Sequence, residues 1–134
     1  MRVHSLNTWL ATLTIAHFVV SGVHGVAHSL ARVSQGPAAV AFVIVVILLG
    51  PLAGLALTRV QPRAGAALIA ATTAGGLLFG LVNHFVLPGA DHVTHVDAEW
   101  RALFGATAAL LAVMELAAVV VGAMAVSRHE GGAV

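Results

Sequence analysis

The sequence predicts an all-α membrane protein: a polytopic bundle of four transmembrane helices that forms a single domain over residues 1–134. Hydrophobic residues make up 60% of the chain and charged residues only 8%, whereas soluble domains carry about 25% charged residues. The mean hydropathy is +1.01. Four stretches are almost free of charge, and each exceeds the roughly 20 residues that a helix needs to cross a bilayer core. They predict helices near residues 7–31, 37–57, 64–87 and 100–126.

The first two predicted helices are separated by a short polar segment around Arg32. The first apolar run is longer than the 7–15 residues of a typical signal-peptide core, and three histidines interrupt it. We therefore interpret it as a membrane helix rather than a cleaved leader. Pro37 suits the first turn of the second helix, and the Gly50-Pro51 pair predicts a kink midway along that helix.

The third and fourth predicted helices flank the most polar stretch of the chain, NHFVLPGADHVTHVDAEW at residues 83–100. Pro88-Gly89 is expected to end the third helix. Asp97 is expected to cap the fourth helix, where Glu99 in the first turn also favours the helix dipole. We interpret these two acids as capping residues rather than ligands.

The arginines predict the orientation in the membrane. With four spans, both termini and the second loop lie on one side. That side holds four arginines, Arg2, Arg59, Arg63 and Arg128, and the opposite side holds Arg32 and Arg101. Basic residues in short loops favour the cytoplasmic side. We therefore expect cytoplasmic termini, with the polar 83–100 segment on the outer face of the cytoplasmic (inner) membrane.

The histidines of the first helix form one stripe. His17, His24 and His28 have the spacing i, i+7, i+11, which places them within about 40° of one another around a helix. Ionisable side chains within a membrane usually face the bundle interior or a watery cavity and are functional by default. The stripe is therefore expected to face the other helices.

Depth along the helices predicts two polar layers. His84 of the third helix lies about one turn from the outer end, at the level of His24 and His28. His17 lies roughly 16 Å below His28, and Glu115 of the fourth helix lies at a similar depth. We therefore expect an outer histidine layer and a deeper layer that contains His17 and Glu115.

The polar loop contains further candidate ligands in the motif DHVTH. Asp91 and His95 are spaced i, i+4, and His92 and His95 are spaced i, i+3, so one helical turn can present them together. This spacing predicts that the loop folds over the histidine stripe and adds ligands at the outer mouth of the bundle.

These residues predict an integral membrane protein that binds one or two transition-metal ions. The expected ligands are the candidates of the outer layer: His24, His28, His84, Asp91, His92 and His95. The chain has no cysteine, and imidazole with carboxylate suits copper(II), iron or zinc. His17 and Glu115 are expected to tune the site or to relay protons. The site is suited to redox or hydrolytic chemistry, and whether the protein is an enzyme stays open.

Three alternatives use the same residues differently. A transporter or delivery protein would pass metal ions or protons along the stripe. A b-type haem protein would use His84 with His24 or His17 as axial ligands, although haem does not explain the histidines of the outer loop. A scaffold or accessory subunit would need no cofactor.

The expected partners are the bilayer, a metal ion and either a second copy of the chain or a larger membrane complex. Nucleic acid is not expected, because the net charge is only +1 and the sequence has no basic patch.

Overall fold

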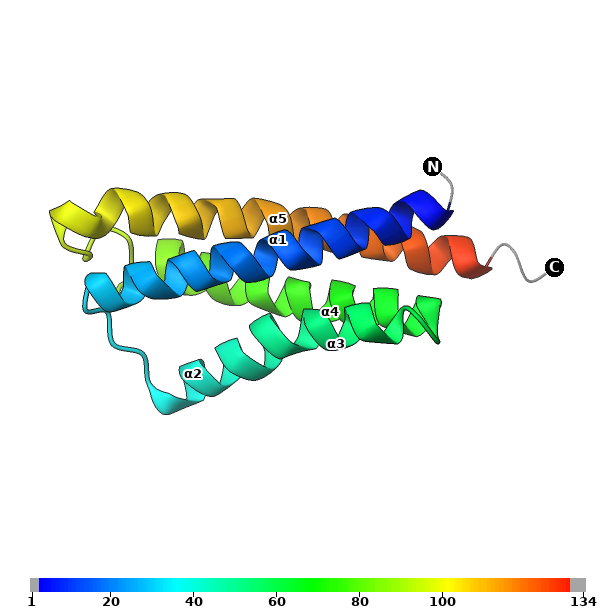
Figure 1. The fold of residues 1–134 in the computed structure, drawn as a ribbon. Coiled ribbons are helices and arrows are strands. Elements are labelled where there is room, and N and C mark those ends of the chain that lie inside the picture. Colours follow the sequence, from blue (N-terminus) through cyan, green and yellow to red (C-terminus); the bar gives the residue numbers. More distant parts are fainter. Residues whose placement is uncertain (1–2, 131–134) are drawn as a thin grey trace.

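The computed structural model describes residues 3–130, and the side chains of residues 5–128. Helices make up 83% of the described residues, and there is no strand among them. The helical segments follow one another as four rods (Figure 1), in which η1 and η2 are π-helical turns. The rods are α1 (Val3–Leu30); α2 (Pro37–Phe42), η1 (Val43–Leu49) and α3 (Gly50–Leu57); α4 (Pro62–Leu81) and η2 (Val82–Val86); and α5 (Ala98–Glu130).

The four predicted long apolar helices are confirmed, with bounds that differ from the prediction by a few residues. The spans that are long and apolar enough to cross a membrane are Ser5–Leu30, Pro37–Leu57, Pro62–Val86 and Ala98–Arg128. Little of each span is buried within the described chain, and large apolar side chains cover the outside of the bundle. Since such a surface suits lipid rather than water, the chain has the character of a membrane protein. Arg2, which contributed to the predicted orientation, lies outside the described residues.

The rods pack most closely at the end of the bundle where α1 starts and α5 finishes, here called the terminal end (Figure 1). Leu6, Leu10 and Ile69 are fully buried there. Small residues bring the helices together, as is usual in membrane bundles. At Gly65, an added Cβ would lie 2.5 Å from the backbone nitrogen of Thr58. The contact between α3 and α4 is therefore tight at this end.

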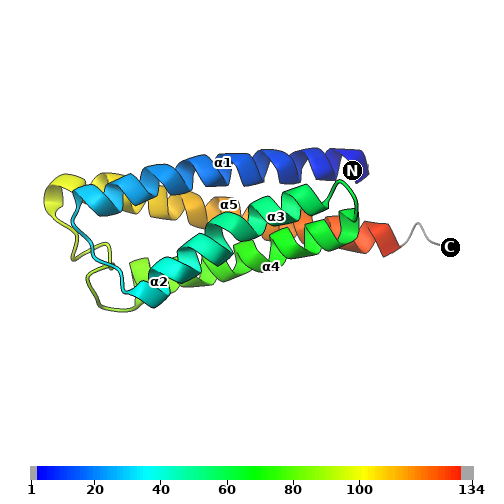
Figure 2. The same ribbon diagram turned by 60° about the horizontal axis from the view of Figure 1, so that its bottom comes forward.

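The second rod diverges from α1 toward the opposite end of the bundle, here called the loop end (Figure 1, Figure 2). The α3 segment lies against α4, whereas no residue of α2 or η1 is fully buried. The sequence predicts a kink at Gly50-Pro51, and the structure has a π-helical turn over η1, which ends directly before Gly50. Proline lacks the N–H that an α-helix needs, so an irregular segment beside it has a physical cause.

The 87–97 segment closes the loop end over α1 and α5. Val96 is buried with Ala27 and Phe104, and the Arg101 guanidinium donates hydrogen bonds to the Val96 carbonyl. The backbone N–H of Val93 donates to the carbonyl of His84 at 2.9 Å. These contacts fix the loop on the bundle and hold its residues beside His84.

Candidate metal centre

Three histidines from two rods meet near the loop end. His24 and His28 come from α1, and His84 comes from η2. The Nε2 atom of His24 lies 3.2 Å from the Nε2 of His84 and 3.2 Å from the Nε2 of His28. His24 and His84 are buried, and His28 is partly buried. This group, called the histidine cluster below, is able to hold a metal ion.

The spacing of the ring nitrogens matches metal coordination. Two nitrogens that bind a tetrahedral ion at about 2.0–2.1 Å lie about 3.3–3.4 Å from each other. The two 3.2 Å separations at His24 are close to that value. The separation of His24 from each of the other two imidazoles therefore suits two ligands of one metal ion.

Thr107 of α5 is the hydrogen-bond partner of the His24 Nδ1 atom. The Thr107 hydroxyl donates back to its own helix, with its Oγ1 2.8 Å from the Leu103 carbonyl and 3.0 Å from the Phe104 carbonyl. When the hydroxyl proton is used there, the Nδ1–H of His24 donates to the Thr107 oxygen, 2.8 Å away. In the neutral ring, the Nε2 of His24 then carries a lone pair.

The backbone of the loop fixes His84 in the same way. The Nδ1–H of His84 donates to the carbonyl of Asp91 at 3.0 Å, so its Nε2 also carries a lone pair in the neutral ring. Two lone pairs therefore face each other across 3.2 Å between His24 and His84. Two neutral acceptors at this distance repel, and a cation held between them removes the repulsion.

His28 and the carboxyl group of Asp91 complete the surroundings of the cluster. The Asp91 Oδ1 lies 3.4 Å from the Nε2 of His28. That carboxyl oxygen and the Nδ1 of His28 are buried without a hydrogen-bond partner. The ring of Phe104 packs against all three imidazoles, with centroid distances of 4.8 to 5.1 Å. The cluster therefore has an apolar wall on one side and an unsatisfied carboxyl oxygen beside it.

The π-helical turn η2 carries His84 to the cluster. The α4 helix ends at Leu81, and the chain continues as a wider turn in which the N–H of Leu87 bonds to the carbonyl of Val82. Such turns are rare and occur frequently at functional sites. The sequence predicted the depth of His84 on a regular helix, and the direction of its side chain depends on this wider turn.

The structure does not bring His92 and His95 into the histidine cluster. His92 bonds through Nδ1 to the Thr94 hydroxyl at 2.8 Å, and His95 bonds through Nδ1 to the Gly89 carbonyl at 2.6 Å. Their rings lie beside each other, with centroids 5.6 Å apart, and His95 is exposed. Asp97, predicted as a cap, directly precedes α5. In the structure, the loop histidines stabilise the loop locally, and Asp91 is the loop residue that reaches the cluster.

The deeper polar layer consists of a pair in direct contact. The Nε2 of His17 lies 3.0 Å from the Oε1 of Glu115, and both side chains are buried. Gly76 of α4 leaves room for the carboxyl group, because an added Cβ there would meet Glu115. The pair therefore lies below the cluster and is separate from it.

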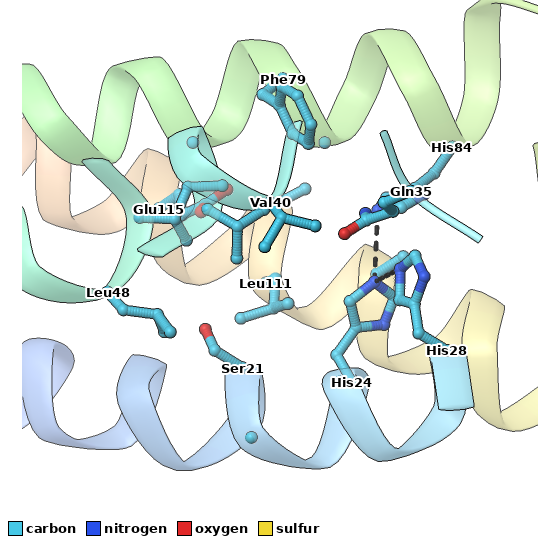
Figure 3. A pocket seen from close by; sticks show the side chains of 18 of the residues that line it. Ser21, His24, His28, Gln35, Val40, Leu48, Phe79, His84, Leu111 and Glu115 are labelled. Carbon is cyan, nitrogen blue, oxygen red and sulfur yellow. Dashed lines mark hydrogen bonds between the residues drawn. The ribbon is translucent and has the colours of Figure 1, made fainter. Parts of the chain in front are cut away.

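A cavity of about 500 Å³ connects the two polar layers. Figure 3 shows His24, His28, His84 and Gln35 at one end of it and Glu115 and Leu48 toward the other. Most of the lining surface is apolar. Pockets of this size and character are typical of small-molecule sites.

The sequence interpretation missed three residues near the cluster: Thr107, Phe104 and Gln35. Thr107 had a recognisable signal, since it is the only hydroxyl residue between Arg101 and Val126. Phe104 is one of many apolar residues and had no such signal. Gln35 donates to the Oδ2 of Asp91 at 3.4 Å, a contact between two loops that no local pattern predicts.

Comparison of the chain with known proteins found no relative. No family model matches the chain, and neither a curated protein nor a solved structure matches it.

Proposed function

We propose that this membrane protein binds one transition-metal ion through the Nε2 atoms of His24, His28 and His84. The observation that carries the proposal is the convergence of three ring nitrogens, with the Nε2 of His24 3.2 Å from the Nε2 of His84 and 3.2 Å from the Nε2 of His28. Metal-bound histidines usually donate their other ring N–H to a carbonyl or another oxygen acceptor. His24 and His84 make such bonds, to the Thr107 hydroxyl and the Asp91 carbonyl.

The proposed centre keeps a position open for a ligand. Structural zinc sites use four protein ligands, whereas catalytic sites use three and leave a place for water or substrate. The cluster supplies three imidazoles, and all three line the cavity. Imidazole ligands suit zinc, copper(II) or iron, and such an ion would supply Lewis-acid or redox chemistry to a molecule in the cavity.

The geometry favours one ion over a dinuclear centre or haem. A second ion would need His92 and His95, which are bonded within their own loop. Axial histidines of haem bind on opposite faces, so their nitrogens lie about 4 Å apart, at about 2 Å on each side of the metal. The nitrogens of His24 and His84 are 3.2 Å apart, and His17 is bonded to Glu115.

The test is elemental analysis, with an absorption spectrum, of the protein purified in mild detergent without added metal or chelating resin. We expect one zinc, copper or iron ion per chain and no Soret band. His24→Gln and His84→Gln should each lose the ion. His95→Gln is the matched control and should keep it, because its ring lies outside the cluster. Full metal content in the double variant of His24 and His84 would refute the site, and a Soret band would favour haem.

Ion transport is the second candidate, and one observation favours it. Among the described side chains of α1, three buried oxygens lack a hydrogen-bond partner: Asn7 Oδ1, Thr14 Oγ1 and Ser21 Oγ. They recur at seven-residue intervals, so they lie along one face of the helix. Buried polar atoms of this kind are usually satisfied by water, and a row of waters below the cluster would form a path toward the terminal end.

Flux measurements separate transport from a fixed centre. In proteoliposomes that contain a fluorescent chelator, a transporter would carry the bound metal species inward, and Thr14→Val would slow that flux without changing the metal content in detergent. A resident centre predicts the same metal content and no flux above that of protein-free vesicles.

A further inference from the structure

The cavity beside the histidine cluster opens between α1 and the second rod, within the membrane-spanning part of both. Its rim includes Phe18 and Val40, which are 46% and 40% exposed. Both residues belong to spans that are long and apolar enough to cross a membrane. At these two residues the rim therefore lies on a surface that suits the hydrocarbon region of a bilayer.

The wall at this mouth is loosely packed. Gly22 and Gly25 of α1 line the cavity, and an added Cβ at either position would meet nothing within 4 Å. On the other side, α2 and η1 have no fully buried residue. By contrast, α3 is in close contact with α4 at Gly54 and Gly65. The second rod is thus held at the terminal end and stands away from α1 at the loop end (Figure 1).

The interior of the cavity is amphipathic along its length. One end is formed by the histidine cluster and Gln35, while Val40 and Leu111 lie between that end and Glu115 (Figure 3). At the deep end Glu115 is already bonded to His17 and is only 4% exposed. The distance along α1 from His24 to His17, seven residues, is roughly 10 Å. An elongated apolar molecule with one polar head group fits this distribution.

We propose that the cavity binds a lipid-soluble molecule from the bilayer, with an oxygen-bearing head group at the histidine cluster and an apolar chain between α1, η1 and α5. This inference rests on the proposed function for the head group, which would occupy the open position of the metal ion. The apolar chain is held by the cavity itself, independently of the metal.

The first experiment compares two metal-binding probes, acetohydroxamate and octanohydroxamate, on cobalt(II)-loaded protein in lipid nanodiscs. The visible absorption of cobalt reports the binding of the head group. We expect octanohydroxamate to bind more than about tenfold more tightly, because its additional methylene groups are buried in the cavity. Ala112→Phe should abolish this advantage, because Ala112 lines the cavity.

Ala109→Phe is the matched control for that variant. Ala109 lies one turn away on α5, is exposed and does not line the cavity, so the chain-length advantage should be unchanged. An equal advantage in Ala112→Phe and Ala109→Phe would mean that the longer probe merely partitions into lipid. Equal affinity of the two probes for the unmodified protein would also overturn the inference.

A second measurement separates failure of the cavity from failure of the metal centre. A photoreactive diazirine derivative of a fatty alcohol is cross-linked to the protein in nanodiscs without metal, and the labelled peptides are mapped by mass spectrometry. We expect labelling at the cavity rim and lining, reduced in Ala112→Phe and kept in Ala109→Phe. Uniform labelling of the lipid-facing surface would refute the cavity site. Cavity labelling without stoichiometric cobalt would refute the metal-bound head group and the proposed function together.

Discussion

At the scale of single residues, the Thr107 hydroxyl is the contact that decides how His24 can act. It accepts the Nδ1–H of His24 at 2.8 Å while donating to its own helix. This leaves the Nε2 of His24 as an acceptor that faces the other two imidazoles. The availability of the nitrogen for a metal is therefore a consequence of a neighbour on another helix.

Replacing Thr107 with valine should weaken metal binding without abolishing it. The substitution keeps the shape of the side chain but removes the acceptor that orients His24. Loss of such an outer partner typically lowers metal affinity by about 10–100-fold. Competition with a chromogenic chelator measures the change. Thr107→Ser should restore affinity, and Thr72→Val is the control, because the Thr72 hydroxyl bonds only within its own helix. Unchanged affinity in Thr107→Val would contradict the assigned tautomer.

Replacing Glu115 tests the deeper pair. Glu115→Leu should lower the free energy of unfolding by about 1–3 kcal/mol, because it leaves the buried Nε2 of His17 without a partner. Glu115→Gln keeps an oxygen and an N–H at that position and should cost much less. Titration with SDS measures both variants. If the Glu115→Leu and Glu115→Gln variants were equally stable, the contact between His17 and Glu115 at 3.0 Å would contribute nothing to the free energy of unfolding.

At the scale of helices, the spacing of the rods depends on where glycine allows backbones to touch. An added Cβ at Gly65 would lie 2.5 Å from the Thr58 nitrogen and 2.6 Å from the Gly54 carbonyl oxygen. Both neighbours are backbone atoms, so relief requires movement of a whole helix. By contrast, Gly22 faces open space. The same residue type therefore has opposite roles at the two ends of the bundle.

Alanine substitution should destabilise the protein at Gly65 but not at Gly22. Gly65→Ala should destabilise the protein by about 1–3 kcal/mol, because overpacking forces backbone shifts. Gly22→Ala should be neutral or stabilising by up to about 1 kcal/mol, because alanine favours the helix. Thermal unfolding in one detergent compares the two variants. A Gly65→Ala variant as stable as Gly22→Ala would mean that α3 and α4 do not pack as closely as described.

At the scale of the whole molecule, the sidedness inferred from the arginines is testable because the chain has no cysteine of its own. Ser34 and Thr94 are exposed in the two connections at the loop end, and Gln61 is exposed in the connection at the terminal end. If the loop end is outside, Ser34→Cys and Thr94→Cys should react with a membrane-impermeant maleimide in intact cells. Gln61→Cys should react only after permeabilisation. The reverse pattern would invert the assigned topology.

The positions of the histidines show which contacts helical spacing predicts and which it does not. His24 and His28 meet because a spacing of four residues on one helix brings side chains together wherever the helix packs. Their meeting with His84 depended on a turn of π-helix at residues 82–86. His92 and His95 followed a helical spacing too, but the loop directs their Nδ1 atoms to Thr94 and Gly89. Helical spacing does not predict the contacts of these two residues, because tertiary contacts determine the conformation of a short loop.

The sequence by itself determined the four apolar spans and the inward face of α1, because hydropathy and helical periodicity are local properties of the chain. Only the tertiary structure decided which polar groups touch: Thr107 with His24, the Asp91 carbonyl with His84, and His17 with Glu115. It also decided that the second rod diverges and leaves a cavity beside the cluster. These features depend on how helices cross and where a loop is fixed, and neither is a local property of the chain.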